Sequence, residues 1–216
     1  DFTTYMQTDP LFRKGRHGML TFSMIYAYSE KFVLVFSHDE VVHLKGSMFA
    51  KMPGEPEEKY ANLRVAYGFM MAHPGKKLLF MGQEFAQETE WNEKQELPWE
   101  QAEEPDHRAL QQYVKALNTF YQEHPAWYET DFDAEGFEWL SSMDADHSII
   151  TFMRYDAKKE ERLLVVCNFT PVTYENFKIG VPVAGKYKEI FNSDQISFGG
   201  TGCINARQKS ATQIPW

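Results

Sequence analysis

An unbroken apolar run, FVLVF at 32–36, stands directly before the polar stretch SHDE at 37–40. A short run that is apolar at every position and bounded by polar residues is typical of a strand buried on both faces in a parallel sheet. The run KLLFMG at 77–82 has the same character and is followed by Gln83 and Glu84. The sequence therefore predicts two buried strands, each with acids at its carboxyl end.

The segment between these runs has the apolar spacing of a helix. The residues on the apolar face are Tyr60, Leu63, Tyr67, Met70 and Met71. Pro74 and Gly75 are expected to end this helix. A strand, a helix and a strand in this order predict a β-α-β unit with a right-handed crossover. A second amphipathic helix is expected over 106–123, with Pro105 in its first turn.

The character of the chain changes near residue 130. Short segments rich in β-branched and aromatic residues follow one another there, separated by turn sequences; they are FEWL, HSIITFMRYD, ERLLVVCNFT, YENFKIG and GKYKEIFNS. This pattern predicts an antiparallel sandwich or barrel. We therefore expect two domains, an α/β domain over residues 1–125 and an antiparallel β domain over residues 126–216.

Charge and composition exclude several classes of protein. The formal net charge of −9 argues against nucleic-acid binding, which usually needs a basic face. No stretch reaches the roughly 20 apolar residues of a membrane span, so no membrane partner is expected. Cys167 is expected to be a core residue, and two unpaired cysteines suit a reducing cytoplasm. The chain starts without Met, which suggests that it is cut from a longer protein.

His38 and Asp39 are the first candidates for a functional site. In parallel α/β sheets, functional groups gather at the carboxyl ends of strands, and in β/α barrels this rule is nearly universal. Glu84 occupies the matching place after the second run. The alternatives are a solvated loop with one capping acid at 38–40 and a salt bridge at Glu84. Glu40 is the weakest candidate, because it can simply begin the next loop.

Metal, phosphate and serine-hydrolase chemistry find no support in the sequence. His38 and His43 are five residues apart, which does not align them on one helix face. The sequence contains none of the glycine-rich phosphate motifs and no G-x-S-x-G elbow. Trp91 and Asn92 follow the second run, where an aromatic ring could stack on a sugar and an amide could bind its hydroxyls. Most tryptophans are structural, so only the position of Trp91 favours such a role.

Long blocks of the chain resemble bacterial glycogen branching enzymes, a family within the α-amylase superfamily. The blocks are FVLVFSHDEVVHLKGSM, YANLRVAYGFMMAHPGKKLLFMGQEFAQETEWN, DFDAEGFEWL and VVCNFTPV. The resemblance implies the last two β/α units of a (β/α)8 TIM barrel, followed by an antiparallel β-sandwich. In two places the chain departs from the family, which usually has Pro-Leu instead of Val35-Phe36 and Gly instead of Leu44.

The resemblance also implies a mechanism. Such enzymes cut an α-1,4-glucan by double displacement and transfer the freed segment to a 6-hydroxyl, which makes an α-1,6 branch. By resemblance, Asp39 is the carboxylate that stabilises the distorted sugar in the transition state. His38 binds the same sugar, while Glu84, Trp91 and Asn92 line the substrate site. The nucleophile and the acid/base would lie in a missing N-terminal part of the enzyme, and no cofactor or metal is expected.

Two other functions stay open from the sequence. The chain could act as a non-catalytic glucan-binding fragment that uses its β domain and Trp91 or Trp99. It could also belong to a related α-glucan hydrolase, because the choice between water and a sugar acceptor depends on loops. If the chain is instead a segment of a branching enzyme, the isolated chain is expected to be inactive, because the nucleophile and the acid/base are missing.

Overall fold

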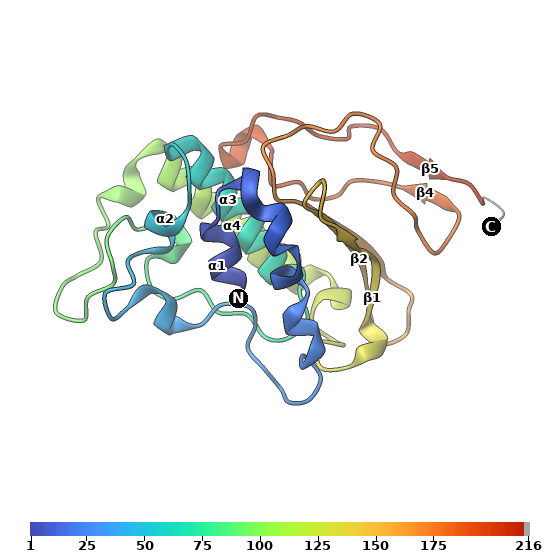
Figure 1. The fold of residues 1–216 in the computed structure, drawn as a ribbon, viewed down its shortest axis with the longest axis horizontal. Helices are drawn as coiled ribbons and strands as arrows, with labels where there is room; N and C mark the ends of the chain where they lie inside the picture. Colours follow the sequence, from blue (N-terminus) through green and yellow to red (C-terminus); the bar gives the residue numbers. More distant parts are fainter. Residues whose placement is uncertain (214–216) are drawn as a thin grey trace.

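Helices occupy one half of the molecule and β-strands the other in the computed structural model, which describes residues 1–213 (Figure 1). The α-helices are α1 (Phe2–Gln7), α2 (Met48–Lys51), α3 (Pro56–Ala72) and α4 (Pro105–Glu123). The strands are β1 (Phe137–Asp144), β2 (Ile149–Tyr155), β3 (Arg162–Asn168), β4 (Gly185–Tyr187) and β5 (Lys209–Ala211). The 3₁₀ helices are η1 (Pro10–Leu20), η2 (Phe22–Ile25), η3 (His38–Val41), η4 (Gln83–Phe85), η5 (Gln101–Glu103), η6 (Pro125–Trp127), η7 (Ala134–Gly136) and η8 (Ile196–Phe198).

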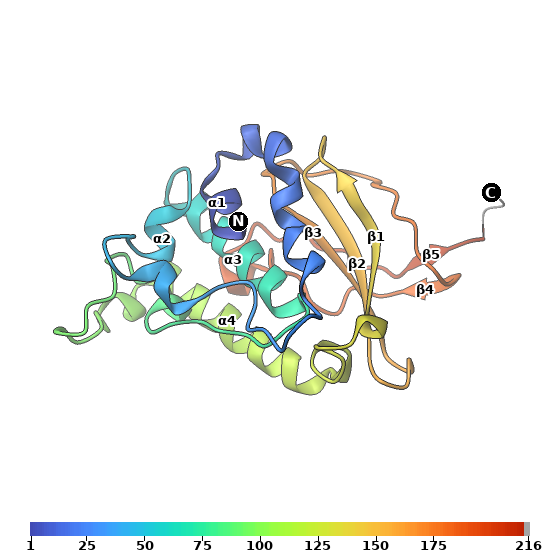
Figure 2. The same cartoon turned by 60° about the horizontal axis from the view of Figure 1, so that its bottom comes forward.

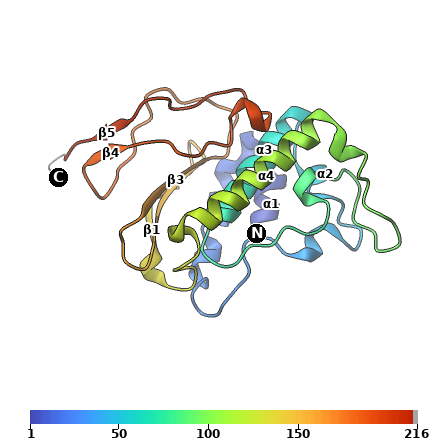
Figure 3. The ribbon, with the colours of Figure 1, turned by 180° about the vertical axis from the view of Figure 1, so that it is seen from behind.

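Both predicted helices are confirmed as α3 and α4, which lie side by side through the middle of the molecule (Figure 3). Pro105 begins α4, and α3 ends at Ala72, just before Pro74. The two helices approach closely at Gly68, where an added Cβ would lie 2.7 Å from the Tyr113 hydroxyl. Within residues 1–213, no helix is both long enough and apolar enough to cross a bilayer.

The three-stranded sheet β1-β2-β3 is antiparallel, as the sequence predicts (Figure 2). All seven residues of the central strand β2 are buried. Phe152 on β2 packs edge-on against Phe69 of α3, with ring centroids 6.3 Å apart. On the β1 side, His17 of η1 contacts the Ser142 carbonyl at 3.1 Å. The sheet is therefore covered by elements from the first half of the chain.

The predicted strands at 32–36 and 77–82 do not form. In their place the structure has one parallel bridge, between Val33 and Lys76. The Leu34 amide donates to the Lys76 carbonyl at 2.9 Å, and the Lys76 amide donates to the Phe32 carbonyl at 3.0 Å. The two segments are thus neighbours and parallel, but no other strand within residues 1–213 pairs with either of them. A parallel strand needs neighbours to continue its ladder, which explains why the sequence prediction was wrong here.

The last part of the chain is less regular than predicted. The segment YENFKIG forms no strand, and GKYKEIFNS supplies only the short strand β4, which pairs with β5 in a separate two-stranded sheet. This small sheet projects away from the body of the molecule (Figure 1). Phe191 and Phe198 anchor the segment between β4 and β5 on α4, with rings 5.8 and 5.3 Å from the Tyr113 ring. The antiparallel character is confirmed, while a full sandwich is not present in residues 1–213.

Two buried arginines join the helical half to the sheet. Arg13 donates to the Phe169 carbonyl at 2.6 Å and to the Asn62 side chain at 2.7 Å. Arg154 on β2 donates to the Ala72 carbonyl at the end of α3, at 2.7 Å. The apolar core is likewise continuous from α1 to the end of β3. The domain boundary at 125/126 stays a prediction, and packing does not break there.

Candidate functional site

Asp39 lies at the surface, in the 3₁₀ turn η3 that follows the buried Phe36. Its side chain is 49% exposed. The Ser37 hydroxyl and the Lys45 ammonium both donate to its carboxylate, the latter at 3.2 Å. These hydrogen bonds, from Ser37 first and then from Lys45, lower the pKa of Asp39. Asp39 is therefore an ionised, oriented carboxylate that a ligand can reach.

His38 and Trp91 are brought together through Phe80. The exposed His38 ring lies 6.0 Å from the Phe80 ring, and Phe80 contacts the Trp91 ring edge-on at 5.0 Å. The carboxyl ends of the runs 32–36 and 77–82 therefore lie close together, as expected for two neighbouring parallel segments. Trp91 is partly buried against the core, so much of its ring has a packing role.

Glu84 and Asn92 do not join this group through any direct contact among residues 1–213. Glu84 lies half-buried in η4, and within residues 1–213 its side chain makes no hydrogen bond or ion pair with Asp39 or His38. Asn92 is exposed and accepts from the Lys94 amide at 2.9 Å, which is a turn contact. Trp99, 48% exposed, packs against Phe85 at 5.4 Å. Their substrate roles stay predictions.

Glu90 organises the loop after η3, and the sequence reasoning did not find it. One of its carboxylate oxygens accepts from the Leu44 amide at 2.9 Å, and the other accepts from the Gly46 amide at 2.6 Å. These two backbone hydrogen bonds, from Gly46 first, lower the pKa of Glu90. The only signal in the sequence was its place beside Trp91.

The space between the segments 41–49 and 81–91 is nearly filled. A cavity of about 10 Å³ remains there, bordered by residues such as Ser47, Met81 and Trp91. A volume of this size holds at most one water molecule. This cavity is too small for a sugar, and neither Asp39 nor His38 lines it.

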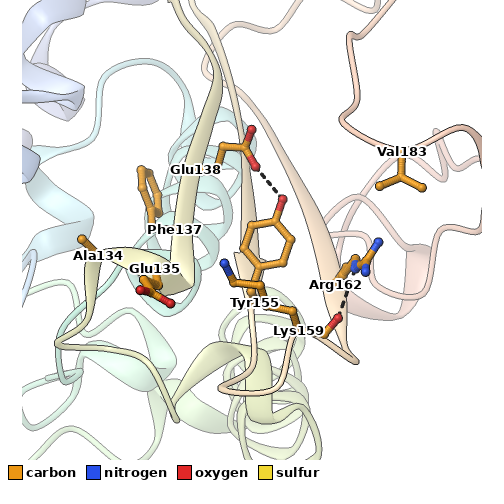
Figure 4. Close-up of a pocket in the computed structure, with 8 residues that line it drawn as sticks. All are labelled: Ala134, Glu135, Phe137, Glu138, Tyr155, Lys159, Arg162 and Val183. Atoms are coloured by element: carbon orange, nitrogen blue, oxygen red, sulfur yellow. Dashed lines mark hydrogen bonds between the residues drawn. The ribbon is translucent and has the colours of Figure 1, made fainter. Parts of the chain in front are cut away.

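A larger hollow of about 340 Å³ lies elsewhere, at the sheet (Figure 4). In it, the Tyr155 hydroxyl donates to the Glu138 carboxylate at 2.6 Å, and Arg162 donates to the Lys159 carbonyl at 3.1 Å. Burial and the bond to Glu138 raise the pKa of Tyr155, so its hydroxyl stays protonated. None of the site residues predicted from the sequence lines this hollow. Among residues 1–213, no three His, Cys, Asp or Glu side chains are grouped as metal ligands would be.

Comparison with known proteins gives consistent matches. Residues 139–214 match the family described as "Alpha amylase, C-terminal all-beta domain". The whole chain is 50% identical to a 1,4-alpha-glucan branching enzyme of Aquifex aeolicus and 48% identical to one of Oceanobacillus iheyensis, covering 34% of each. It is 46% identical to the Shewanella frigidimarina enzyme, of which it covers 29%. Along its whole length, the chain is similar to one part of these branching enzymes. It spans about a third of the length of these relatives.

The structure shows what the backbone demands at position 44, where a departure from the family pattern is expected from the sequence. Leu44, for which the resemblance implies Gly in the family, has a φ of 66°. This left-handed region is open to glycine but unfavourable for a residue with a Cβ. Leu44 is also 97% exposed, so its side chain gains nothing from packing. Glu90 holds this loop in a conformation that a glycine would adopt readily.

Proposed function

We propose that this chain is part of an enzyme that cuts α-1,4-glucan and transfers the freed segment to a 6-hydroxyl, which forms α-1,6 branches. The similarity of the whole chain to 1,4-alpha-glucan branching enzymes supports the reaction. The observation that carries the site is the carboxylate of Asp39, exposed directly after the buried Phe36 and oriented by Ser37 and Lys45. No observation favours a stand-alone glucan-binding fragment or a hydrolase.

In this proposal Asp39 accepts hydrogen bonds from sugar hydroxyls at the cleavage point, and His38 binds the same sugar. A hydrogen bond that tightens only in the distorted, oxocarbenium-like sugar lowers the barrier, whereas uniform binding does not. The nucleophile and the acid/base of the double displacement come from the rest of the enzyme. Glu84, Trp91 and Asn92 contribute at the border of the site.

The barrel part of the proposal rests on the bridge between Val33 and Lys76, with α3 between the two segments in the chain. This is the order of a β-α-β unit, and residues 1–125 would be the end of a (β/α)8 barrel. Several large apolar side chains in the first 33 residues are exposed; they are Leu11, Phe12, Phe22, Ile25 and Val33, each at least 46% exposed. We expect the rest of the enzyme to cover these side chains.

The two cysteines support a cytoplasmic location for the enzyme. Cys167 is buried, Cys203 is exposed, and both are free thiols. Exported proteins commonly use their cysteines in disulfides.

The test is Asp39→Asn in the full-length enzyme that contains this chain. We expect turnover on amylose, followed by loss of iodine colour and by debranching of the product, to fall at least about 10³-fold, while amylose binding changes far less. Glu40→Gln, next to it in η3, is the matched control. Near-normal turnover of the Asp39 variant would remove the basis of the proposal, and free reducing ends without new branches would indicate a hydrolase.

A further inference from the structure

The proposed mechanism does not use Glu90, yet both of its carboxylate oxygens are occupied by one loop. The Leu44 amide lies 2.9 Å from one oxygen, and the Gly46 amide lies 2.6 Å from the other. Hydrogen bonds from backbone amides to an ionised carboxylate are charge-assisted and about twice as strong as neutral ones. Glu90 therefore binds this loop firmly.

The loop that Glu90 binds has a backbone that needs such support. His43 and Leu44 have φ values of 60° and 66°, and Gly46 has a φ of 76°. A non-glycine residue in this region costs about 1–2 kcal/mol. Conformations of this kind persist only where the surroundings determine them strongly, and they gather at functional sites.

Neighbours of Glu90 fix both ends of the same loop. The Trp91 amide donates to the Val41 carbonyl at 3.2 Å, and the Ser47 hydroxyl donates to the Glu88 carbonyl at 2.7 Å. The Lys51 ammonium also donates to the Gly46 carbonyl at 2.9 Å. The segment 88–91 thus determines the course of the backbone from Val41 to Ser47.

Lys45 connects this loop to the candidate site. It lies between the two residues whose amides Glu90 binds, and its ammonium donates to the Asp39 carboxylate at 3.2 Å. Glu90 therefore fixes the position of the Lys45 backbone, from which the side chain extends to Asp39. A shift of about 1 Å in a supporting group can cost about 10²-fold in rate.

We propose that Glu90 is a positioning residue: it fixes the loop 43–46 so that Lys45 holds the Asp39 carboxylate in the orientation that the sugar hydroxyls require. This inference rests on the proposed function of Asp39. Glu90 itself faces the loop amides, so it acts through Lys45 and does not touch the substrate.

The test is Glu90→Gln in the full-length enzyme, with Glu93→Gln as the control. The substituted amide keeps the size of Glu90 but offers one acceptor where two amides need one each. Glu93 is exposed three residues further along the chain and makes none of these contacts. We expect kcat on amylose to fall on the order of 10- to 10²-fold with KM changed less than about twofold. The melting temperature should fall by only a few degrees, and the control should match the parent.

A double-mutant cycle tests the path through Lys45. Lys45→Met should lower kcat to a similar degree, Lys45→Arg should retain most activity, and Glu90→Gln with Lys45→Met should be no worse than either alone. Additive losses, or a Glu90→Gln variant whose kcat stays within about twofold of the parent, would overturn the inference. If Asp39→Asn stays active, the proposed function fails; if only the Glu90 variant stays active, this inference alone fails.

Discussion

Asp131 and Asp39 both lie beside cations, but in opposite surroundings. Asp131 is fully buried, and it accepts from Arg154 at 3.1 Å, from Lys76 at 3.0 Å and from the Tyr121 hydroxyl at 3.1 Å. Asp39 is half exposed and has Ser37 and Lys45 as its donors. Donors from the protein itself bind the buried Asp131 carboxylate, so it stabilises the fold. The Asp39 carboxylate is exposed and stays accessible to a ligand. Burial thus separates a structural acid from a candidate catalytic one.

The largest effect on stability is expected at Asp131. Asp131→Asn leaves Arg154 as a buried charge without its partner, which typically costs about 3–5 kcal/mol of unfolding free energy. Urea denaturation of the 216-residue chain measures this. Asp146→Asn, which removes an exposed pair with Lys14, is the control and should change little. Equal effects of the two substitutions would contradict the contrast between buried and exposed pairs.

Acid should destabilise the fold through His73. Its Nε2 accepts from the Ser23 hydroxyl at 2.8 Å and its Nδ1 donates to the Pro74 carbonyl at 2.7 Å, so it is held neutral. Burial lowers its pKa to about 3. The unfolded chain therefore binds a proton first, and the contribution of His73, complete above about pH 6.5, is lost as pH falls toward 3, by up to about 1.4 kcal/mol per pH unit.

Denaturation series at several pH values measure this acid limb. His73→Gln should flatten it, while the exposed His38→Gln should leave it unchanged. An unaltered slope in the His73 variant would show that another group causes the loss.

A smaller effect, in the opposite direction, is expected in the loop near Asp39. Leu44→Gly relieves the positive φ of 66°, which costs a non-glycine residue about 1–2 kcal/mol. Glycine also raises the conformational entropy of the unfolded chain, which offsets about 0.4–1 kcal/mol of this gain in unfolding free energy. We expect a net rise in unfolding free energy of about 1 kcal/mol or less. A clear decrease would mean that the exposed Leu44 side chain has a stabilising contact.

The smallest stability effect is expected at Asp39 itself. Asp39→Asn should leave the denaturation midpoint of the chain unchanged, because its side chain is half exposed and its partners can turn to water. The same substitution should abolish turnover in the full enzyme. A large loss of stability would place Asp39 with Asp131 among the structural acids.

The helices and the central sheet could be predicted from local patterns. Apolar spacing and the prolines at 74 and 105 gave α3 and α4 almost to their ends, and the alternation of turn signals and β-branched residues gave β1 to β3. Local patterns could not decide whether the runs at 32–36 and 77–82 form strands. Their apolar character says that they are buried, but a parallel ladder depends on neighbours far away in the chain.

The candidate site was predicted in part. His38 and Asp39 could be found because polar residues directly after an apolar run mark the end of a buried segment. Glu90 was missed because it binds backbone amides, and these leave no signature in the side chains of the loop. The left-handed residues His43 and Leu44 gave no signal either, since the usual marker of such a conformation is glycine.

Arg13 has a consequence for how this chain folds. It bonds to the Phe169 carbonyl, 156 positions away, and also to the Met6 carbonyl and to the Asn62 side chain. The helical elements around Arg13 cannot supply all the acceptors that its guanidinium needs. The last acceptor, the Phe169 carbonyl, is available only after the segment following β3 has packed against them. Closing so long a loop is slow, because its entropy is lost before the contacts form. Amide hydrogens of α1 and of β3 should therefore exchange with solvent together, in one cooperative opening of both halves.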